Sequence, residues 1–361
     1  MASFGASAVV VGVVTGAGEA AALVLRLVSG PLADRTRRFW AWTIAGYAMT
    51  VVTVPLLGLA GTLWVACGLV IAERVGKAVR SPAKDTLLSY ATAVTGRGRG
   101  FAVHEALDQI GAVLGPLTVA AVLVVSGGDY TPALLFLAVP GVAALALLAW
   151  LCARVPDPGV YEPVTRVPAS PVPAPREARR LPREFWVYAG FTAATTLGFT
   201  TFGVLSFHLV ERGLLPAAGV PVLYAAAMAV DAVAALGTGW LFDRFGPVAV
   251  AVLPLLAAAV PALAFTDSLP AAVLGILTWG AAIGVQESTL RATVAELVAP
   301  SRRATAYGVY AAVIGAATLA GGALTGLLYE YSIPLLVGVV IAVQVAALAV
   351  LAAVRLRGAP G

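Results

Sequence analysis

Apolar residues recur along the chain in long runs separated by short polar or charged segments. Runs of roughly twenty apolar residues are the length that an α-helix needs to cross the hydrocarbon layer of a membrane, whereas barrel strands would be alternating segments of about ten residues. The pattern predicts an all-α polytopic membrane protein. Its eleven expected spans are 6–29, 40–60, 62–86, 99–126, 131–153, 186–210, 218–241, 247–266, 269–297, 304–328 and 332–354.

Composition supports this interpretation. Of 361 residues, 60% are hydrophobic and 11% are charged, and the mean hydropathy is +0.93. Soluble domains are less apolar and carry about twice this charged fraction. The first run has no basic leader and no cleavage-site pattern, so we expect it to stay in the mature protein. Cys67 and Cys152 both fall inside expected spans, which suggests neither a disulfide framework nor a cysteine metal site.

Arginine is distributed unevenly between the two sides of the expected membrane. If the loop at 30–40 is cytoplasmic, sixteen arginines lie on its side and Arg212 alone lies on the other. This asymmetry follows the positive-inside rule, so the net charge of +5 does not indicate nucleic-acid binding. We expect an inner-membrane protein whose linker and C-terminus are cytoplasmic and whose N-terminus, as the chain is given, lies outside.

Residues 155–183 are rich in Pro and Arg and are expected to form a cytoplasmic linker. They separate an N-terminal bundle of five helices, 1–154, from a C-terminal bundle of six helices, 184–361. We therefore expect two helical bundles joined by one linker.

Two short motifs occur once in each half of the chain. The loop GPLADR at 30–35 returns as GWLFDR at 239–244, and RGRGFAVHEA at 97–106 aligns without gaps on RATAYGVYAA at 303–312. The two offsets, 209 and 206 residues, nearly agree. Internal repeats of this kind are the plan of many secondary transporters.

The doubled G-x-L-x-D-R loop resembles the motif of the major facilitator superfamily, and the resemblance covers essentially the whole chain. It implies a two-bundle transporter that works by alternating access. In that family one further helix precedes the one that ends at the first motif, so the eleven spans would match family helices two to twelve. Two interpretations stay open, a start codon assigned too late and a true eleven-helix form.

The resemblance also implies that the loop motif is a latch in which each aspartate lies near a helix N-terminus of the other bundle. The latch residues are Gly30, Asp34, Arg35, Gly239, Asp243 and Arg244.

Ionisable residues inside spans are costly, at roughly 2.5–3.5 kcal/mol each on insertion scales, and persist where they face a cavity or a partner. The second, fifth, eighth and eleventh spans contain none in their apolar stretches. The ionisable residues in the other spans therefore predict an aqueous path through the protein. Candidates for substrate recognition or coupling are Glu19, Glu73, Arg74, Asp108, Asp231 and Trp279, although a lone buried Trp is more often a packing residue. Candidates for a gating ion-pair network are Arg26, Lys77, Arg80, His104, Glu105, Glu287 and Arg291.

The segment Gly111-x-x-x-Gly115-Pro116 is first of all a helix-packing pattern. It also resembles part of a fifth-helix motif of antiporters in the superfamily, but Val119 and Ala120 stand where that motif ends in two glycines. Because the match is partial, it favours antiport or efflux only mildly.

The leading hypothesis is a proton-coupled secondary transporter of a small solute, acting as a monomer among membrane lipids and without a cofactor. One alternative is efflux of a transition-metal ion through His104, Glu105 and Asp108, but one helix face supplies too few ligands for a dedicated metal site. Another is a sensor or scaffold that keeps the fold without transporting. No Walker A pattern or nucleophile motif is present in the sequence, so neither ATP-driven transport nor an enzyme is expected.

Overall fold

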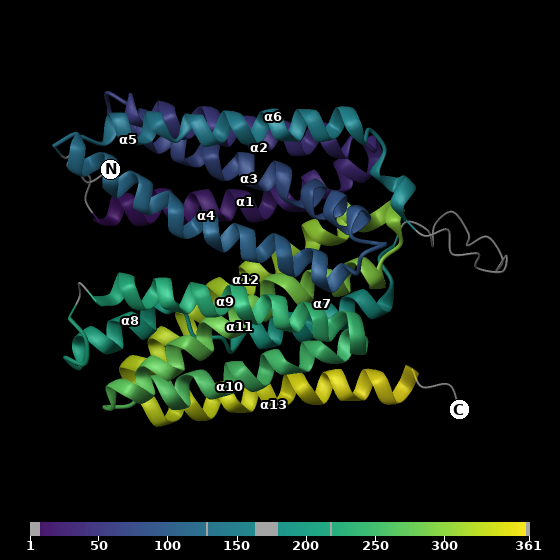
Figure 1. Ribbon diagram of the computed structural model, residues 1–361. Coiled ribbons are helices and arrows are strands. Elements are labelled where there is room, and N and C mark those ends of the chain that lie inside the picture. Colours follow the sequence, from purple (N-terminus) through teal and green to yellow (C-terminus); the bar gives the residue numbers. More distant parts are fainter. Residues whose placement is uncertain (1–7, 128, 163–179, 217–218, 359–361) are drawn as a thin grey trace. The chain divides into compact units, whose positions relative to one another are not determined.

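The computed structural model describes residues 8–127, 129–162, 180–216 and 219–358, and the side chains of 8–20, 116, 120 and 352–358 lie outside that description. Within these ranges every regular element is helical (Figure 1). The α-helices are α1 (Ala8–Thr36), α2 (Phe39–Gly58), α3 (Leu63–Ala91), α4 (Arg97–Val125), α5 (Tyr130–Phe136), α6 (Ala138–Arg154), α7 (Arg183–Leu197), α8 (Phe202–Glu211), α9 (Val220–Phe245), α10 (Val252–Ala264), α11 (Leu269–Leu297), α12 (Arg303–Tyr331) and α13 (Ile333–Gly358). Short 3-10 turns are η2 (Pro158–Tyr161), η5 (Gly246–Ala251) and η6 (Pro300–Arg302).

Eight helical stretches in the described residues are long and apolar enough to cross a membrane. The expected all-helical membrane class is therefore confirmed, while the division into eleven spans stays a prediction. The stretch Val220–Ala264 contains both α9 and α10. The two helices are separated by η5, whose first residue, Gly246, has a positive φ of 67°. Helix α3 is absent from the eight because charged residues interrupt its apolar face.

The helices form two compact units, neither of which is one continuous piece of chain. Unit 1 contains 1–91, 110–162 and 300–312, and unit 2 contains the remaining residues. Helices α4 and α12 thus each contribute residues to both units.

In unit 1, α3 packs against α1 and α2, and α5 and α6 cover α2. Figure 1 shows α1, α2 and α3 running side by side. The Ser29 hydroxyl in α1 donates to the Ala78 carbonyl in α3 at 2.9 Å. A small apolar core at one end of this unit is formed by Ala33, Phe39, Ala83, Leu87, Tyr90 and Ala304. This core positions the end of α1 beside the beginning of α12.

In unit 2, α11 packs against α9 and α10, and α13 packs against α10 and α7. The backbones of α9 and α11 approach closely where glycine replaces a side chain. A Cβ atom at Gly280 would overlap the Ala227 carbonyl, and one at Gly284 would overlap the Asp231 carbonyl. Because no larger residue fits, α9 and α11 are held at a fixed register.

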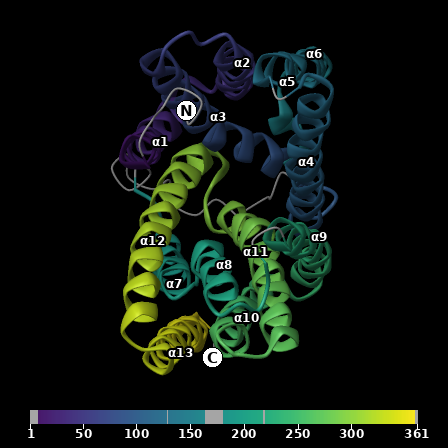
Figure 2. The same cartoon turned by 90° about the vertical axis from the view of Figure 1, so that its left-hand side faces the viewer.

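The expected span 186–210 is not one continuous helix. Helix α7 ends at Leu197, α8 begins at Phe202, and residues 198–201 between them are non-helical. The break lies near the middle of the apolar stretch Arg183–Glu211. Figure 2 shows α7 and α8 lying between α12 and α11 in unit 2. Gly198, Phe199 and Thr200 are buried, so the unwound backbone is covered by protein.

Candidate functional site

The first copy of the loop motif fastens the end of α1 to the beginning of α12. Asp34 accepts hydrogen bonds from the backbone N–H groups of Ala304 at 3.1 Å and Thr305 at 2.7 Å, and also from the Thr305 hydroxyl. Gly30 permits this approach because its Cα lies against the Ala304 carbonyl. Burial raises the pKa of the Asp34 carboxyl above its ordinary value, opposed by these hydrogen bonds and by the positive charge of Arg302.

The second copy has the same geometry in unit 2. Asp243, near the end of α9, accepts hydrogen bonds from the backbone N–H groups of Gly98 at 2.8 Å and Arg99 at 3.0 Å, at the beginning of α4. The Arg99 side chain adds an ion pair at 3.6 Å. Gly239 lies against the Gly98 carbonyl, as Gly30 lies against Ala304. Each aspartate therefore caps a helix N-terminus, where a carboxylate is favoured by the free N–H groups and the helix dipole.

The other latch residues do not share this role. Arg35 is exposed at the end of α1, and Arg244 lies over the rings of Trp240 at 5.5 Å and Phe245 at 5.6 Å.

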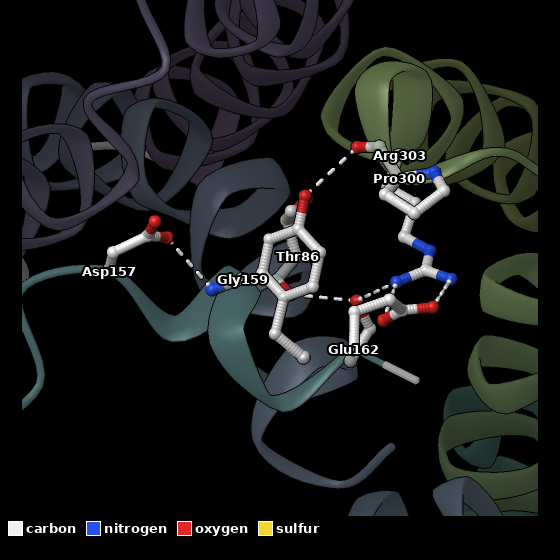
Figure 3. A network of polar contacts seen from close by, with 8 residues as sticks. Thr86, Asp157, Gly159, Glu162, Pro300 and Arg303 are labelled. Carbon is white, nitrogen blue, oxygen red and sulfur yellow. Dashed lines mark hydrogen bonds and ion pairs between the residues drawn. The ribbon is translucent and has the colours of Figure 1, made fainter. Parts of the chain in front are cut away.

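A second contact holds the beginning of α12, and the sequence did not predict it. The Arg303 guanidinium donates to both carboxylate oxygens of Glu162, at 2.7 and 2.8 Å, and lies 5.5 Å from the centre of the Tyr90 ring (Figure 3). The Tyr90 hydroxyl donates to the Pro300 carbonyl at 3.0 Å. Glu162 belongs to the expected linker and follows η2, whose first turn is capped by Asp157. The first residues of the linker are thus bound to unit 1.

The charged face of α3 is internally paired. Glu73 lies 3.0 Å from the Lys77 ammonium and 3.7 Å from the Arg74 guanidinium. The Arg80 guanidinium lies 4.0 Å from the centre of the Tyr47 ring in α2. Glu73 and Arg74, proposed from the sequence for coupling, therefore take part in ion pairs of the kind expected for the network of Lys77 and Arg80.

Three other predicted residues, Glu19, Arg26 and His104, lie in α1 and α4. The side chain of Glu19 lies outside the described residues, and Arg26 and His104 are half-buried in α1 and α4. The Arg26 carbonyl lies against Gly308 of α12, so this part of α1 packs closely.

Unit 2 contains a group of ionisable residues from three helices, which we call the acid cluster: the buried Glu105 in α4, the buried Asp231 in α9, and the half-buried Glu287 with its ion-pair partner Arg291 in α11. Glu105 is 3% exposed and accepts a hydrogen bond from Gln109 at 2.7 Å. Glu287 and Arg291 both act on it electrostatically, and Asp231 lies within electrostatic range of Glu105 and Glu287. From the sequence, Asp231 was a coupling candidate and the other three belonged to the gating network, whereas the fold brings all four together.

Asp231 is the most unusual member of the acid cluster. It is 0% exposed, and among the described residues neither of its carboxylate oxygens has a hydrogen-bond partner. Its backbone carbonyl lies against Gly284 of α11, so α9 and α11 pack closely at this residue. A buried ionised carboxylate without a donor is strongly unfavourable, so this group is suited to binding a proton or another cation.

Asp108 and the predicted packing glycines lie on an open face of α4. Asp108 is exposed, and a methyl group added at Gly111 or Gly115 would meet no described atom within 4 Å. The Pro116 side chain lies outside the described residues. The structure therefore shows no close helix contact at either glycine within the described residues.

Trp279 lies in α11 beside the break between α7 and α8. It is 7% exposed, and its indole N–H donates to the Thr200 carbonyl at 2.9 Å. Its ring also packs near Phe199 and Phe202. The Trp279 side chain is therefore a packing residue in this structure, in contact with the break between α7 and α8. The sequence TLGFTTF at 196–202 carries the signal for the break, since Thr and Gly cluster there, but its apolar content conceals the signal.

The metal alternative stays a prediction. Within the described part of the chain, no group of three or more His, Cys, Asp or Glu residues is placed to hold a metal ion. Neither ring nitrogen of His208 is available, because they contact the Tyr329 hydroxyl at 3.0 Å and the Thr266 carbonyl at 3.3 Å.

Comparison with known proteins agrees with the doubled motif and the helical fold. The chain is 65% identical over 361 residues to the uncharacterized protein Rv2265 of Mycobacterium tuberculosis, covering 100% of this chain and 88% of that protein. Its fold is similar to the major facilitator transporter FucP in the outward conformation, with a TM-score of 0.71, 13% identity, and 97% and 92% of the two chains covered.

It is also similar to the proton:xylose symporter XylE, with a TM-score of 0.68, 12% identity, and 93% and 84% of the chains covered. At these identities the two structures support the fold alone. The family model described as Major Facilitator Superfamily matches residues 1–286 and again 215–361. This multi-pass integral membrane protein therefore belongs to the Major Facilitator Superfamily of transporters.

Proposed function

We propose that the protein is a secondary active transporter that couples the movement of a small solute to protons. Family and fold support membrane transport, and the acid cluster of unit 2 supports the choice of driving ion. The observation that carries the proposal is Asp231, a fully buried carboxyl group without a described hydrogen-bond donor in the apolar stretch Val220–Ala264.

The charges of the acid cluster favour proton uptake. Three ionised carboxylates, with the exposed Asp108 adding a fourth negative charge within electrostatic range, would face the positive charge of Arg291, which is already paired with Glu287. Like charges in a site of low polarity repel strongly, and one proton relieves both the repulsion and the cost of burial. Asp231 and Glu105 are therefore assigned as the proton-binding groups, with Glu287 and Arg291 setting their surroundings.

Solute movement would follow from alternating access between the two halves of the chain, 1–154 and 184–361, joined by the linker. Arginine asymmetry favours the inner membrane, with the loop motifs and the linker on the cytoplasmic side. The two aspartate caps and the Glu162–Arg303 pair then lie at the cytoplasmic ends of their helices. They would form and break as that side closes and opens.

The test uses purified full-length protein in liposomes that contain a trapped pH-sensitive dye. Mixtures of small solutes are added outside, and any solute that moves with protons changes the internal pH. Asp231→Asn should abolish that response, or reduce it at least tenfold, because the amide cannot carry the proton. The matched control is Asp267→Asn, which changes an acid whose side chain is 83% exposed and should leave the response intact.

The sign of the pH change separates the two coupling modes. Internal alkalinisation on inward solute movement indicates antiport, which the partial motif at Gly111–Pro116 favours, and acidification indicates symport. A solute transported at equal rate by the wild-type protein and Asp231→Asn, without a pH change, would refute proton coupling at this group. Failure to find any transported solute in a protein shown to be folded would favour the sensor or scaffold alternative.

A further inference from the structure

We propose that the break between α7 and α8 binds a monovalent metal cation, with Na⁺ as the expected ion. The site is distinct from the acid cluster and does not depend on the proton coupling proposed above. It consists of the unwound residues 198–201, the last turn of α7, and Gln344 from α13.

The backbone alone marks this place as unusual. Residues 198–201 leave the helix near the middle of an apolar stretch that is long enough to cross the membrane, and Gly198, Phe199 and Thr200 are buried. Irregular backbone at membrane depth is tolerated where protein covers it or where it lines a site, and interrupted helices often carry ion sites in transporters. The C-terminal end of α7, the negative end of its dipole, points into the break.

Four side-chain oxygen atoms at the break have no described partner. They are the hydroxyl oxygens of Thr195, Thr196 and Thr200 and the amide oxygen of Gln344, and no residue in the described ranges bonds to any of them. The four residues are between 0% and 2% exposed. Buried polar atoms are nearly always satisfied, and an amide oxygen can only accept, so this set calls for a donor or a cation.

Two neighbouring nitrogen groups already donate to backbone carbonyls. The Gln344 side-chain N–H donates to the Thr195 carbonyl at 2.9 Å, and a Cβ atom on Gly198 would lie 2.8 Å from the same nitrogen. The amide is therefore held against the break with its oxygen left over. On the other side, the Trp279 indole donates to the Thr200 carbonyl at 2.9 Å.

The chemistry of the remaining atoms selects the ion. All four are neutral oxygens, which suit hard cations, and no Asp or Glu occurs between Thr195 and Thr201. Divalent Ca²⁺ and Mg²⁺ are normally held by carboxylates, so a singly charged ion fits better. Gly321 of α12 packs against the last residues of α7, since a Cβ atom there would lie 2.6 Å from the Leu197 carbonyl.

The experiment measures the unfolding midpoint of the purified full-length protein in NaCl, KCl and choline chloride at equal concentration. An ion that binds only the native state raises the midpoint. We expect NaCl to raise it above choline chloride by about 2 °C or more, and Trp fluorescence to change over the same concentration range. Thr200→Val and Thr195→Val should each abolish the Na⁺-dependent shift.

The matched control is Thr192→Val, one turn earlier in α7, whose buried hydroxyl already donates to the Tyr188 carbonyl at 2.7 Å. This variant should keep the Na⁺-dependent shift even if its midpoint is lower overall. Equal midpoints in the three salts would mean that water satisfies the oxygens, and would overturn the proposal. Loss of the shift in Thr192→Val as well would also overturn it. Asp231→Asn should retain the shift, so failure here and failure of proton coupling remain distinguishable.

Discussion

At the scale of single residues, the firmest polar contact in unit 1 is the Glu162–Arg303 pair. The Arg303 side chain is 3% exposed, its guanidinium bonds both oxygens of one carboxylate, and its face lies over the Tyr90 ring. Two-pronged bonds of this kind are among the strongest that proteins make. A buried guanidinium that loses its partner pays the whole cost of desolvation.

Glu162→Gln should therefore destabilise the protein by about 2–4 kcal/mol, because it leaves Arg303 buried without its counter-charge. Replacing both residues, as Glu162→Gln with Arg303→Met, should restore part of the loss. The measurement is the shift of the thermal unfolding midpoint for each single variant and for the double variant. A loss of stability in the double variant equal to the sum of the losses in the two single variants would contradict a direct coupling.

Asp231 and Glu73 show what a sequence can and cannot indicate about one acid. Glu73 pairs with Lys77 at a spacing of four residues in the same helix, which the sequence alone displays. The surroundings of Asp231 come from α4 and α11, so its lack of a described donor could be known only from the packing. Costly acids could be located from the sequence, but which of them lacks a hydrogen-bond donor among the described residues could not.

At the scale of elements, close contact between α9 and α11 depends on glycine at two points one turn apart, Gly280 and Gly284. Backbone touches backbone there, and neither helix can move aside without disturbing Asp231. On α4 the glycines at 111 and 115 have open space beside them. The same residue type thus has opposite roles on two helices.

Gly284→Ala should lower stability by about 1–3 kcal/mol, because the new methyl group overlaps the Asp231 carbonyl. Gly111→Ala is the matched control and should be neutral or stabilising by up to about 1 kcal/mol, since Ala favours a helix and meets no described atom. Thermal unfolding of both variants in the same detergent decides the matter. A similar loss in both would show that helix packing is not the cause.

Most helices could be predicted from the apolar runs, because membrane helices must satisfy their backbone internally. The break at 198–201 could not, since Phe199 and the neighbouring Leu and Phe residues keep the run apolar while the tertiary contacts of Gln344 and Trp279 hold the backbone open. The expected span 131–153 matches the single membrane-length stretch Tyr130–Arg154, in which one residue, Leu137, separates α5 from α6. The pattern of apolar residues predicts which parts of a helix are buried. Breaks within a helix depend on contacts from other helices, which the pattern does not show.

At the scale of the whole molecule, the two aspartate caps recur with matching partners. Asp34 bonds the N–H groups of residues 304 and 305, and Asp243 bonds those of residues 98 and 99. These pairs are related by the same offset of 206 residues as the aligned segments RGRGFAVHEA and RATAYGVYAA. The repeat seen in the sequence is therefore also a repeat of contacts.

Asp34→Ala and Asp243→Ala should each destabilise the protein by about 0.5–2 kcal/mol through loss of a helix cap. The double variant should show the sum within about 0.5 kcal/mol, because the two caps lie in separate units and share no partner. Unfolding midpoints of the three variants test this. A double variant no worse than one single variant would show that the caps act as one structure.

The arrangement of the caps also bears on ancestry. The aspartate from the first half of the sequence binds a helix from the second, and the aspartate from the second half binds the equivalent helix of the first. Such reciprocal exchange is the signature of a twofold symmetric dimer, in which each subunit offers the same patch to the other. A half-length progenitor with one loop motif and one such helix N-terminus would bind its own copy through both contacts. Gene fusion would preserve these two reciprocal contacts within a single polypeptide.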